Sequence, residues 1–432
     1  MTPQDWLRWL VVQCPPRVVL HSYARRGDAL AQLMSAPVGV DDPIPLLESL
    51  RARGRLVRTP LGWATADHEL CRTILRDTDF CVAGGEGFIP KPLRSLMHRS
   101  ELPANPVSPP SMLVINPPDH TKMRKPVAAA FTPRAIGRLR ERVESVTAEL
   151  LDALPANGST DLVSAYASQV PIAIISEMLG FPDHERERFL SWGDAASPLL
   201  DIGLSWRTTR AASQALNKMD AYLDRHIARL RRDPGEDILS GLVSAGELDD
   251  RELKATATLL MGAGFETTVN LISNGVALLS DHPEQLARLR EQPDLWPNAV
   301  EEILRFDAPV QKTARIADRD VDMAGVSVPA EGTVVLLLAG ANRDPKVFDD
   351  PHRFDITRAN AKEHLTFSSG IHVCLGASLA RMEGAYALRS LFERFPDLQL
   401  AGPPQRRPLF TLHGYGRMPV QLGRRAEQPT AA

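Results

Sequence analysis

The feature that most constrains this chain is a glycine-rich segment with one cysteine, placed directly before a helical pattern. It reads Phe367-Ser-Ser-Gly370-Ile-His372-Val-Cys374-Leu-Gly376. Glycine on both sides of the cysteine permits tight turns and close approach of the backbone. The unpaired N–H groups at the start of a helix favour a thiolate over a thiol. Because a thiolate is a soft, electron-rich ligand, the segment predicts that Cys374 binds a haem iron.

Five fixed positions of this segment, Phe-x-x-Gly-x-His-x-Cys-x-Gly, resemble the cysteine-ligand signature of the cytochrome P-450 superfamily. With this composition, a chance match has a probability on the order of one in 100,000. The resemblance implies a triangular, mainly α fold with a small β part, with haem b between a long central helix and the cysteine-loop helix. It also implies that Phe367 and Gly376 contact the haem. The alternative is a structural cysteine in a glycine turn.

The bulk composition is that of a globular enzyme. The chain has 432 residues, 44% hydrophobic and 24% charged, which favours one domain over residues 1–432. A net charge of −3 argues against nucleic acid as the main ligand. Its four cysteines form no Cys-x-x-Cys pair, which excludes a zinc ribbon, a thioredoxin-like site and a c-type haem attachment. So few cysteines indicate a reducing compartment, and we expect a cytoplasmic protein.

Helical periodicity predicts a mainly α fold with a minor β part. At the N-terminus, residues 1–20 read as an amphipathic lead-in helix, because Arg8 and two prolines interrupt the apolar run before the ~20 residues of a membrane span. We expect a disordered tail over residues 424–432. Further helices are expected near residues 135–154, 165–180, 211–231, 251–280, 283–305 and 376–394, and strands at 56–59, 326–329 and 334–338.

The predicted helix 251–280 contains Ala263-Gly264-Phe-Glu266-Thr267-Thr, which resembles the family's Ala-Gly-x-(Asp/Glu)-Thr-Thr segment. In that family the segment crosses the oxygen-binding face of the haem, so Ala263 is expected to contact the cofactor. The resemblance implies that Thr267, whose hydroxyl both donates and accepts, acts on oxygen and that Glu266 carries protons. Gly264 is expected to leave room for dioxygen or water. Taken alone, an ordinary buried helix explains the same pattern.

The two haem propionates require cations in a poorly hydrated site. His120 and Arg124, in Asp-His-Thr-Lys-Met-Arg, stand four residues apart and so share a helix face. This segment, Arg315 and His372 match propionate-binding positions of the family. The resemblance therefore implies four contacts, although any one of these residues alone is equally a solvated surface residue.

A structural ion network is expected beside the cysteine loop. Glu302-Ile-Leu-Arg305 resembles the family's Glu-x-x-Arg, and Pro-His-Arg353-Phe resembles its Pro-x-Arg-Phe element. The first pattern alone is weak, because it recurs elsewhere in the chain. Together the two imply that Glu302, Arg305 and Arg353 form a buried network, which would cost several kcal/mol to break.

These segments predict an enzyme, a monooxygenase that uses dioxygen and external electrons to hydroxylate or epoxidise a lipophilic small molecule. No flavin- or ferredoxin-type region is evident, so the expected partners are a ferredoxin and its NAD(P)H-dependent reductase. Docking is expected near Cys374, with Lys122, Lys125 and Arg134 adding positive charge. The alternatives are a peroxide-driven or non-oxidative haem-thiolate enzyme, and a non-catalytic haem or ligand-binding protein.

The substrate cavity is expected beneath two segments, residues 83–113 and about 185–215. The first is rich in glycine and proline, and a loop of this length in a compact domain is usually functional. Apolar side chains in both segments are candidates for the cavity wall, namely Phe88, Ile89, Leu199, Leu200, Ile202 and Leu204.

Overall fold

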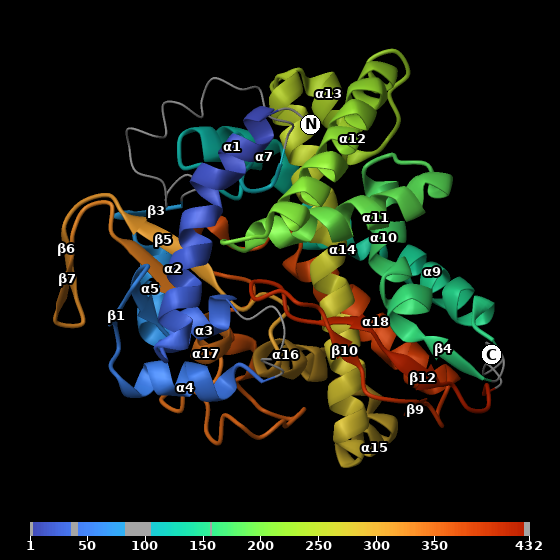
Figure 1. Ribbon diagram of the computed structural model, residues 1–432. Helices are drawn as coiled ribbons and strands as arrows, with labels where there is room; N and C mark the ends of the chain where they lie inside the picture. The colour runs from blue at the N-terminus through green and yellow to red at the C-terminus, as the bar shows by residue number, and fades with distance from the viewer. Residues whose placement is uncertain (1–2, 36–41, 83–104, 156–157, 427–432) are drawn as a thin grey trace.

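The computed structural model describes residues 3–35, 42–82, 105–155 and 158–426. A long helix, α14 (Asp250–Asp281), runs through the middle of the molecule (Figure 1). It begins at a capping box in which the Asp249 carboxylate accepts from the Glu252 N–H and the Glu252 carboxylate accepts from the Asp249 N–H. This exchange satisfies two donors that have no partner within the helix. Most side chains from Leu253 to Leu279 are buried, so α14 is a core helix.

Other helices pack on several sides of α14 and share one large hydrophobic core with it. Tyr166 ties two parts of this core together, because its hydroxyl donates to the carbonyl of Ala387 at 2.8 Å. The helices that contact α14 include α10 (Gln169–Met178), α11 (Arg186–Ala196), α12 (Trp206–Leu230), α15 (Pro283–Glu291), α16 (Trp296–Phe306) and α18 (Ala377–Arg394).

A five-stranded sheet lies beside this helical part, on the left in Figure 1. Its order is β1 (Val57–Thr59), β2 (Gly62–Thr65), β8 (Thr333–Leu336), β5 (Thr313–Ala317), β3 (Phe80–Cys81). β2 and β8 are parallel and the other pairs are antiparallel. In this register Arg315 lies opposite Val334, which fixes its place at the edge of the helical core.

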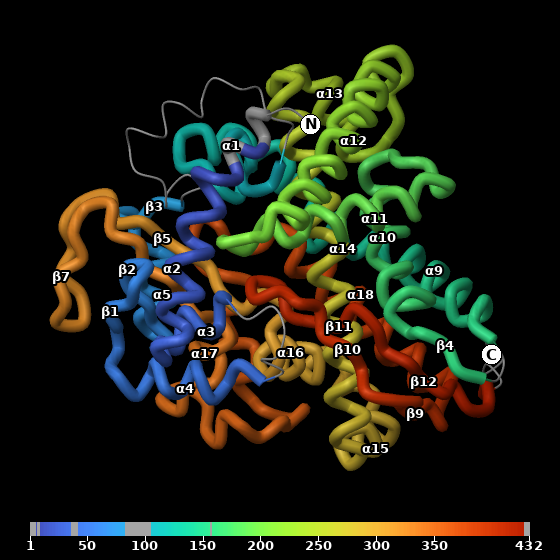
Figure 2. Tube along the Cα trace, viewed as in Figure 1, coloured from blue at the N-terminus to red at the C-terminus, as the bar shows by residue number. Residues whose placement is uncertain are grey.

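Three smaller sheets complete the fold. β4 (Ser159–Asp161) pairs with β12 (Pro419–Gln421), so two segments far apart in the chain lie side by side (Figure 2). The other elements of these sheets are β6 (Val321–Met323), β7 (Val326–Val328), β9 (Gln399–Leu400), β10 (Gln405–Arg406) and β11 (Tyr415–Arg417). The remaining α-helices are α1 (Pro3–Val12), α2 (Cys14–Arg25), α3 (Ala29–Ser35), α4 (Ile44–Ala52), α5 (His68–Arg76), α7 (Asp119–Ala128), α8 (Pro133–Gly137), α9 (Arg140–Ala153), α13 (Ile238–Ala245) and α17 (Leu338–Ala341).

The predicted mainly α fold with a small β part is confirmed, with differences at the ends of elements. The helix expected over 283–305 is two helices, α15 and α16, because Pro293 and Pro297 each lack an N–H for a continuous ladder. The strand expected over 334–338 ends at Leu336, since α17 begins at Leu338. The division of the chain into one domain stays a prediction.

The expected ends of the chain also differ in part. The lead-in is helical, in α1 and α2. Near the start of the expected tail, the Arg425 guanidinium donates to the carbonyls of Leu151 and Asp152 at 3.3 and 3.2 Å, and the tail itself stays a prediction. Residues 427–432 lie outside the described residues. Within the described ranges, no helix has both the length and the apolar character needed to cross a membrane.

Candidate active site

The loop that carries Cys374 is held by backbone contacts just before α18. The Cys374 N–H donates to the Phe367 carbonyl at 2.9 Å. Gly370 has a φ of +73°, and a Cβ there would lie 2.4 Å from the Leu75 carbonyl oxygen, so only glycine fits. At Gly376 an added Cβ would come no closer than 4.0 Å to the Cys374 sulfur. The loop therefore leaves the sulfur accessible, and its side chain is exposed toward a cavity.

Two opposing effects act on the pKa of the Cys374 thiol. Burial raises the pKa of the Cys374 thiol, while the Gly376 N–H and the guanidinium groups of Arg124 and Arg381 favour the thiolate. A metal ion would add to the second effect, because a coordinated thiol is deprotonated. Arg381 also lies over the Phe367 ring, 4.5 Å from its centroid, and pairs with Glu301 at 2.6 Å. Glu301 and Arg381 thus brace the loop, although sequence reasoning assigned them no role.

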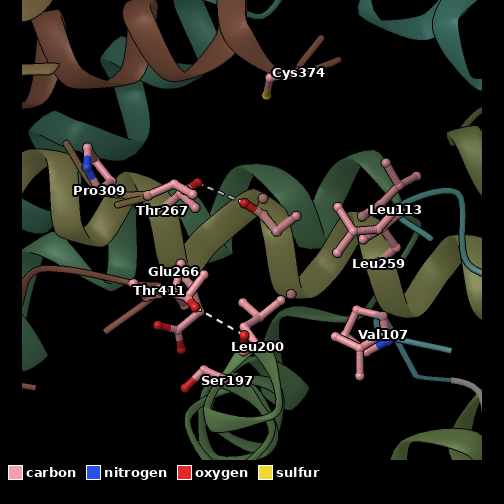
Figure 3. Close-up of a pocket in the computed structure, with 18 of the residues that line it drawn as sticks. Val107, Leu113, Ser197, Leu200, Leu259, Glu266, Thr267, Pro309, Cys374 and Thr411 are labelled. Carbon is pink, nitrogen blue, oxygen red and sulfur yellow. Dashed lines mark hydrogen bonds between the residues drawn. The ribbon is translucent and has the colours of Figure 1, made fainter. Parts of the chain in front are cut away.

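An internal cavity of about 490 Å³ lies between the cysteine loop and α14. Figure 3 shows Cys374 on one side of it, pointing toward α14, where Thr267 lies. All the predicted site residues except His120 line this cavity. Its wall is mainly apolar and includes Leu199, Leu200 and Ile202, as expected.

Three candidates for the cavity wall are not among its lining residues: one lies elsewhere, and two lie outside the described residues. Leu204 is held elsewhere, since its carbonyl accepts from the Trp9 indole and its N–H donates to Gln13. Phe88 and Ile89 lie outside the described residues. Gly264 lines the cavity and also packs closely on α10, since a Cβ there would lie 2.9 Å from Ile175 Cγ1; its expected role of leaving room for oxygen stays a prediction.

Thr267 and Glu266 point in different directions from adjacent positions of α14. The Thr267 hydroxyl borders the cavity and donates to the Ala263 carbonyl at 2.9 Å. Glu266 is only 2% exposed. One oxygen, Oε2, accepts from Arg407 at 2.6 Å, and Oε1 is buried with no hydrogen-bond partner among the described residues. The pair therefore combines a hydroxyl facing the cavity with a carboxyl group held behind it.

Arg407 links Glu266 to the outside of the molecule. Its guanidinium also contacts Asp194 on α11 at 2.8 Å, and the Asp194 side chain is 60% exposed. The pKa of Glu266 is raised to about 7, because burial and the charge of Asp194 raise it by more than Arg407 lowers it. Sequence reasoning missed Arg407 and Asp194, because neither lies near α14 in the chain.

Four nitrogen-bearing side chains expected to receive the propionates lie close together. The His120 and His372 rings lie 4.2 Å apart, and the Nε2 atom of each is buried without a partner among the described residues. Arg124 donates to the Val373 carbonyl, and Arg315 donates to the Ala314 carbonyl at 2.8 Å. In the described part of the chain, none of the four forms an ion pair with a carboxylate. The cluster is therefore an excess of positive charge with unused donors.

The pKa values of this cluster express the same excess of charge. Burial lowers the pKa of His372 to about 3, together with the charges of the neighbouring His120, Arg315 and Arg124 side chains when these are protonated. Burial lowers the pKa of Arg315 to about 10. Anionic groups placed here would reverse these effects.

The network around Glu302 exists, but its second arginine is Arg358 rather than Arg353. Glu302 and Arg305 are fully buried and form two hydrogen bonds of 2.7 and 2.8 Å. Arg358 Nε lies 3.2 Å from Glu302, whereas the Arg353 side chain is 64% exposed. Arg353 contributes only its carbonyl, which accepts from Arg305 at 3.2 Å. The motif is correct in position, but the chain turns the Arg353 side chain outward.

Residues 104–414 match the family model for cytochrome P-450. The chain belongs to the cytochrome P-450 family. It is 47% identical to a putative cytochrome P-450 140 of Mycobacterium tuberculosis, over 97% of this chain and 98% of that one. It is 41% identical to the cytochrome P-450 monooxygenase PikC of Streptomyces venezuelae, over 84% of this chain and 86% of PikC. The predicted family is thus confirmed, and the chain is a cytochrome P-450 monooxygenase.

The fold comparison agrees. The structure of P-450BioI, in complex with an acyl carrier protein ligated to hexadec-9Z-enoic acid, superposes with a TM-score of 0.82 at 35% identity. That match covers 89% of this chain and 99% of P-450BioI. The cytochrome P-450 fold binds haem through a cysteine, so the predicted cofactor is confirmed as well. The residues of this cavity fit that group, with one accessible sulfur on its wall and, beside it, buried donors without anions.

Proposed function

We propose that this cytochrome P-450 inserts one atom of dioxygen into a C–H or C=C bond of a lipophilic small molecule and reduces the other to water. The observation that carries the proposal is the arrangement of Cys374 and Thr267 on either side of one mainly apolar cavity. A lipophilic substrate fits this wall, and the ligand in the P-450BioI complex is also an acyl chain.

The haem would be held by the residues gathered at the cysteine end of the cavity. Cys374 would bind the iron, with Phe367, Gly376 and Ala263 bordering the ring. His120, Arg124, Arg315 and His372 would receive the propionates, whose charge would satisfy the unused donors. When bound, haem supplies activation of dioxygen at an iron made electron-rich by the thiolate.

Thr267 and Glu266 would deliver protons from the opposite wall. The Thr267 hydroxyl can give up its bond to the Ala263 carbonyl and donate into the cavity while accepting from water, which would connect it to Glu266. Glu266, with a pKa raised toward neutrality, both takes up and releases a proton near pH 7. Arg407 and Asp194 would lead from Glu266 to solvent.

Electrons would come from an external partner, which we propose is a ferredoxin served by an NAD(P)H-dependent reductase. The proposed docking face lies near Cys374, where Ile371 and Val373 are exposed. Of the three cations expected on this face, Lys125 and Arg134 are exposed. The third, Lys122, is already paired with Glu252 at 2.7 Å. The attraction would therefore depend on Lys125 and Arg134 rather than on Lys122.

The test compares turnover of a lipophilic substrate with NADPH, ferredoxin and reductase against turnover with hydrogen peroxide alone. We expect product with the first and little with the second, and we expect Thr267→Ala to consume NADPH while releasing mostly peroxide. The reduced, carbon monoxide-treated protein should show the red-shifted thiolate band, and Cys374→Ser should lose it. Turnover driven only by peroxide, or a band that survives Cys374→Ser, would contradict the proposal.

A further inference from the structure

A lysine lies in the wall of the mainly apolar cavity, which is an unusual place for an ammonium group. Lys312, directly before β5, lines the cavity, and its side chain is only 11% exposed. Lysine is among the residues least often buried unless it is paired. Burial lowers the pKa of this ammonium, and Asp201 partly opposes that effect. The molecule thus keeps a poorly hydrated cation in a mainly apolar wall.

Asp201 does not satisfy Lys312. Their closest atoms, Nζ and Oδ1, are 3.9 Å apart, beyond hydrogen-bond distance. The Asp201 carboxylate is already occupied, since it accepts from the Phe410 and Thr411 N–H groups at 2.9 Å each and from the Thr411 hydroxyl at 2.5 Å. Asp201 therefore fixes the 410–411 turn and only attracts the ammonium at a distance. No other described carboxylate forms an ion pair with Lys312.

Lys312 is also separate from the propionate cluster. Among the described residues, the contacts of His120, Arg124, Arg315 and His372 do not include Lys312. Instead, the Lys312 ammonium faces Asp201 and the Phe410 ring, 5.7 Å from its centroid. In Figure 3, Leu200 and Thr411, which lie next to Asp201, are on the opposite side of Thr267 from Cys374. Because Asp201 contacts both Lys312 and Thr411, the ammonium lies on the side of the cavity that Leu200 and Thr411 form, away from the sulfur.

We propose that Lys312 is a specificity-determining residue that binds a carboxylate of the substrate on the side of the cavity away from Cys374. The substrate class is then a lipophilic carboxylic acid, held by its acid group and oxidised elsewhere on its apolar part. This inference rests on the proposed function, because it places a substrate in the same cavity. A bound carboxylate supplies the hydrogen bonds that Asp201 does not, and it compensates the charge of the buried ammonium.

The test measures binding of matched acids and methyl esters by the Soret shift of the haem-loaded protein. The probes are myristic acid, abietic acid and lithocholic acid, each with its methyl ester. The variants are Lys312→Met, Lys312→Arg and a control, Lys218→Met, which removes an exposed lysine of α12 that does not line the cavity. Haem content and the thermal unfolding midpoint are measured for each variant.

Wild type and the control Lys218→Met should bind at least one of the probe acids at least about tenfold more tightly than its methyl ester. Lys312→Met should lose this preference through weaker binding of the acid alone, and Lys312→Arg should retain most of it. Equal acid-to-ester ratios in wild type and Lys312→Met would overturn the inference, and so would loss of haem in Lys312→Met. If the esters bind and the acids bind no more tightly than their esters, the proposed function stands without this inference. If neither the acids nor the esters bind, the proposal of a lipophilic substrate fails as well.

Discussion

The ion pair between Arg407 and Glu266 sets the charge state of the proposed proton carrier, and removing it gives a prediction with a definite sign. Arg407 Nη1 lies 2.6 Å from Glu266 Oε2 and 2.8 Å from Asp194 Oδ1. Because Arg407 lowers the pKa of Glu266 while burial raises it, Arg407→Met should leave burial unopposed. The pKa of Glu266 should therefore rise further above its value of about 7 in the wild type.

The size of this rise follows from the burial of the carboxyl group. Glu266 is 2% exposed, and glutamates buried without a cation reach pKa values of about 8–9. We therefore expect a rise of about 1–2 pH units, or about 1.4–2.7 kcal/mol of differential interaction. Asp194→Asn is a control of opposite sign, because the charge of Asp194 raises the pKa of Glu266. Its effect should be smaller, since Asp194 is 60% exposed and screened by water.

The assay is a pH titration of the carboxylic acid C=O stretching band by infrared difference spectroscopy. Glu266→Gln identifies the band by removing it. In wild type the band should disappear near pH 7, in Arg407→Met about 1–2 pH units higher, and in Asp194→Asn at lower pH than in wild type. A band in Arg407→Met that titrates at or below the wild-type pH would refute the reasoning.

The same shift has a consequence for stability. The pKa of Glu266 is raised on folding, so its neutral form contributes stability below about pH 4.5 that is lost as the pH rises through about 7. In Arg407→Met this loss should continue to higher pH, until the raised pKa is passed. Denaturant unfolding across this pH range measures it.

Three further predictions concern other buried charges. Arg305→Met should lower the free energy of unfolding by about 3–5 kcal/mol, because it removes the two short hydrogen bonds of the buried Glu302 carboxylate and leaves it only Arg358 as a cationic partner. Arg353→Met should change it by less than about 0.5 kcal/mol, and equal losses in denaturant titrations would contradict the assignment. Arg315→Met should release haem about 10–100-fold faster to an excess of apomyoglobin, and an unchanged rate would show that Arg315 holds no propionate. Burial raises the pKa of Glu383 to about 8, so wild type should lose stability as the pH rises from about 4.5 to about 8. Glu383→Gln should lose less over this range, because only the contribution of Glu266 remains, and parallel unfolding curves for the two proteins would be the contrary result.

Residues close together in the chain were predictable, because their geometry is fixed by local structure. The turn at Gly370, the sulfur before α18 and the adjacent Glu266 and Thr267 of α14 all follow from short segments whose backbone conformation brings them to one cavity. The ends of α15 and α16 were missed for a local reason as well, since two prolines interrupt a continuous apolar pattern.

What could not be predicted depends on contacts between distant segments. Arg353 and Arg358 are five residues apart, and only the fold decides that Arg358 returns to Glu302 while Arg353 faces solvent. Arg407 lies far along the chain from α14, and its position has no helical or strand pattern that points to Glu266. The extent to which Glu266 is neutral therefore could not be deduced from the motif that contains it.

Two of these contacts join the same pair of segments, namely the C-terminal end of α11 with the residues just after it and the turn before β11. Asp194 and Asp201, at the C-terminal end of α11 and just beyond it, contact Arg407 and Thr411 of the turn before β11. If α11 moves away from this turn, Arg407 loses Asp194, and Glu266 becomes the one described carboxylate paired with it. The charge of Asp194 would then no longer raise the pKa of Glu266, and that pKa should fall. Closure of α11 over the cavity should have the opposite effect and favour the protonated, proton-donating form of Glu266.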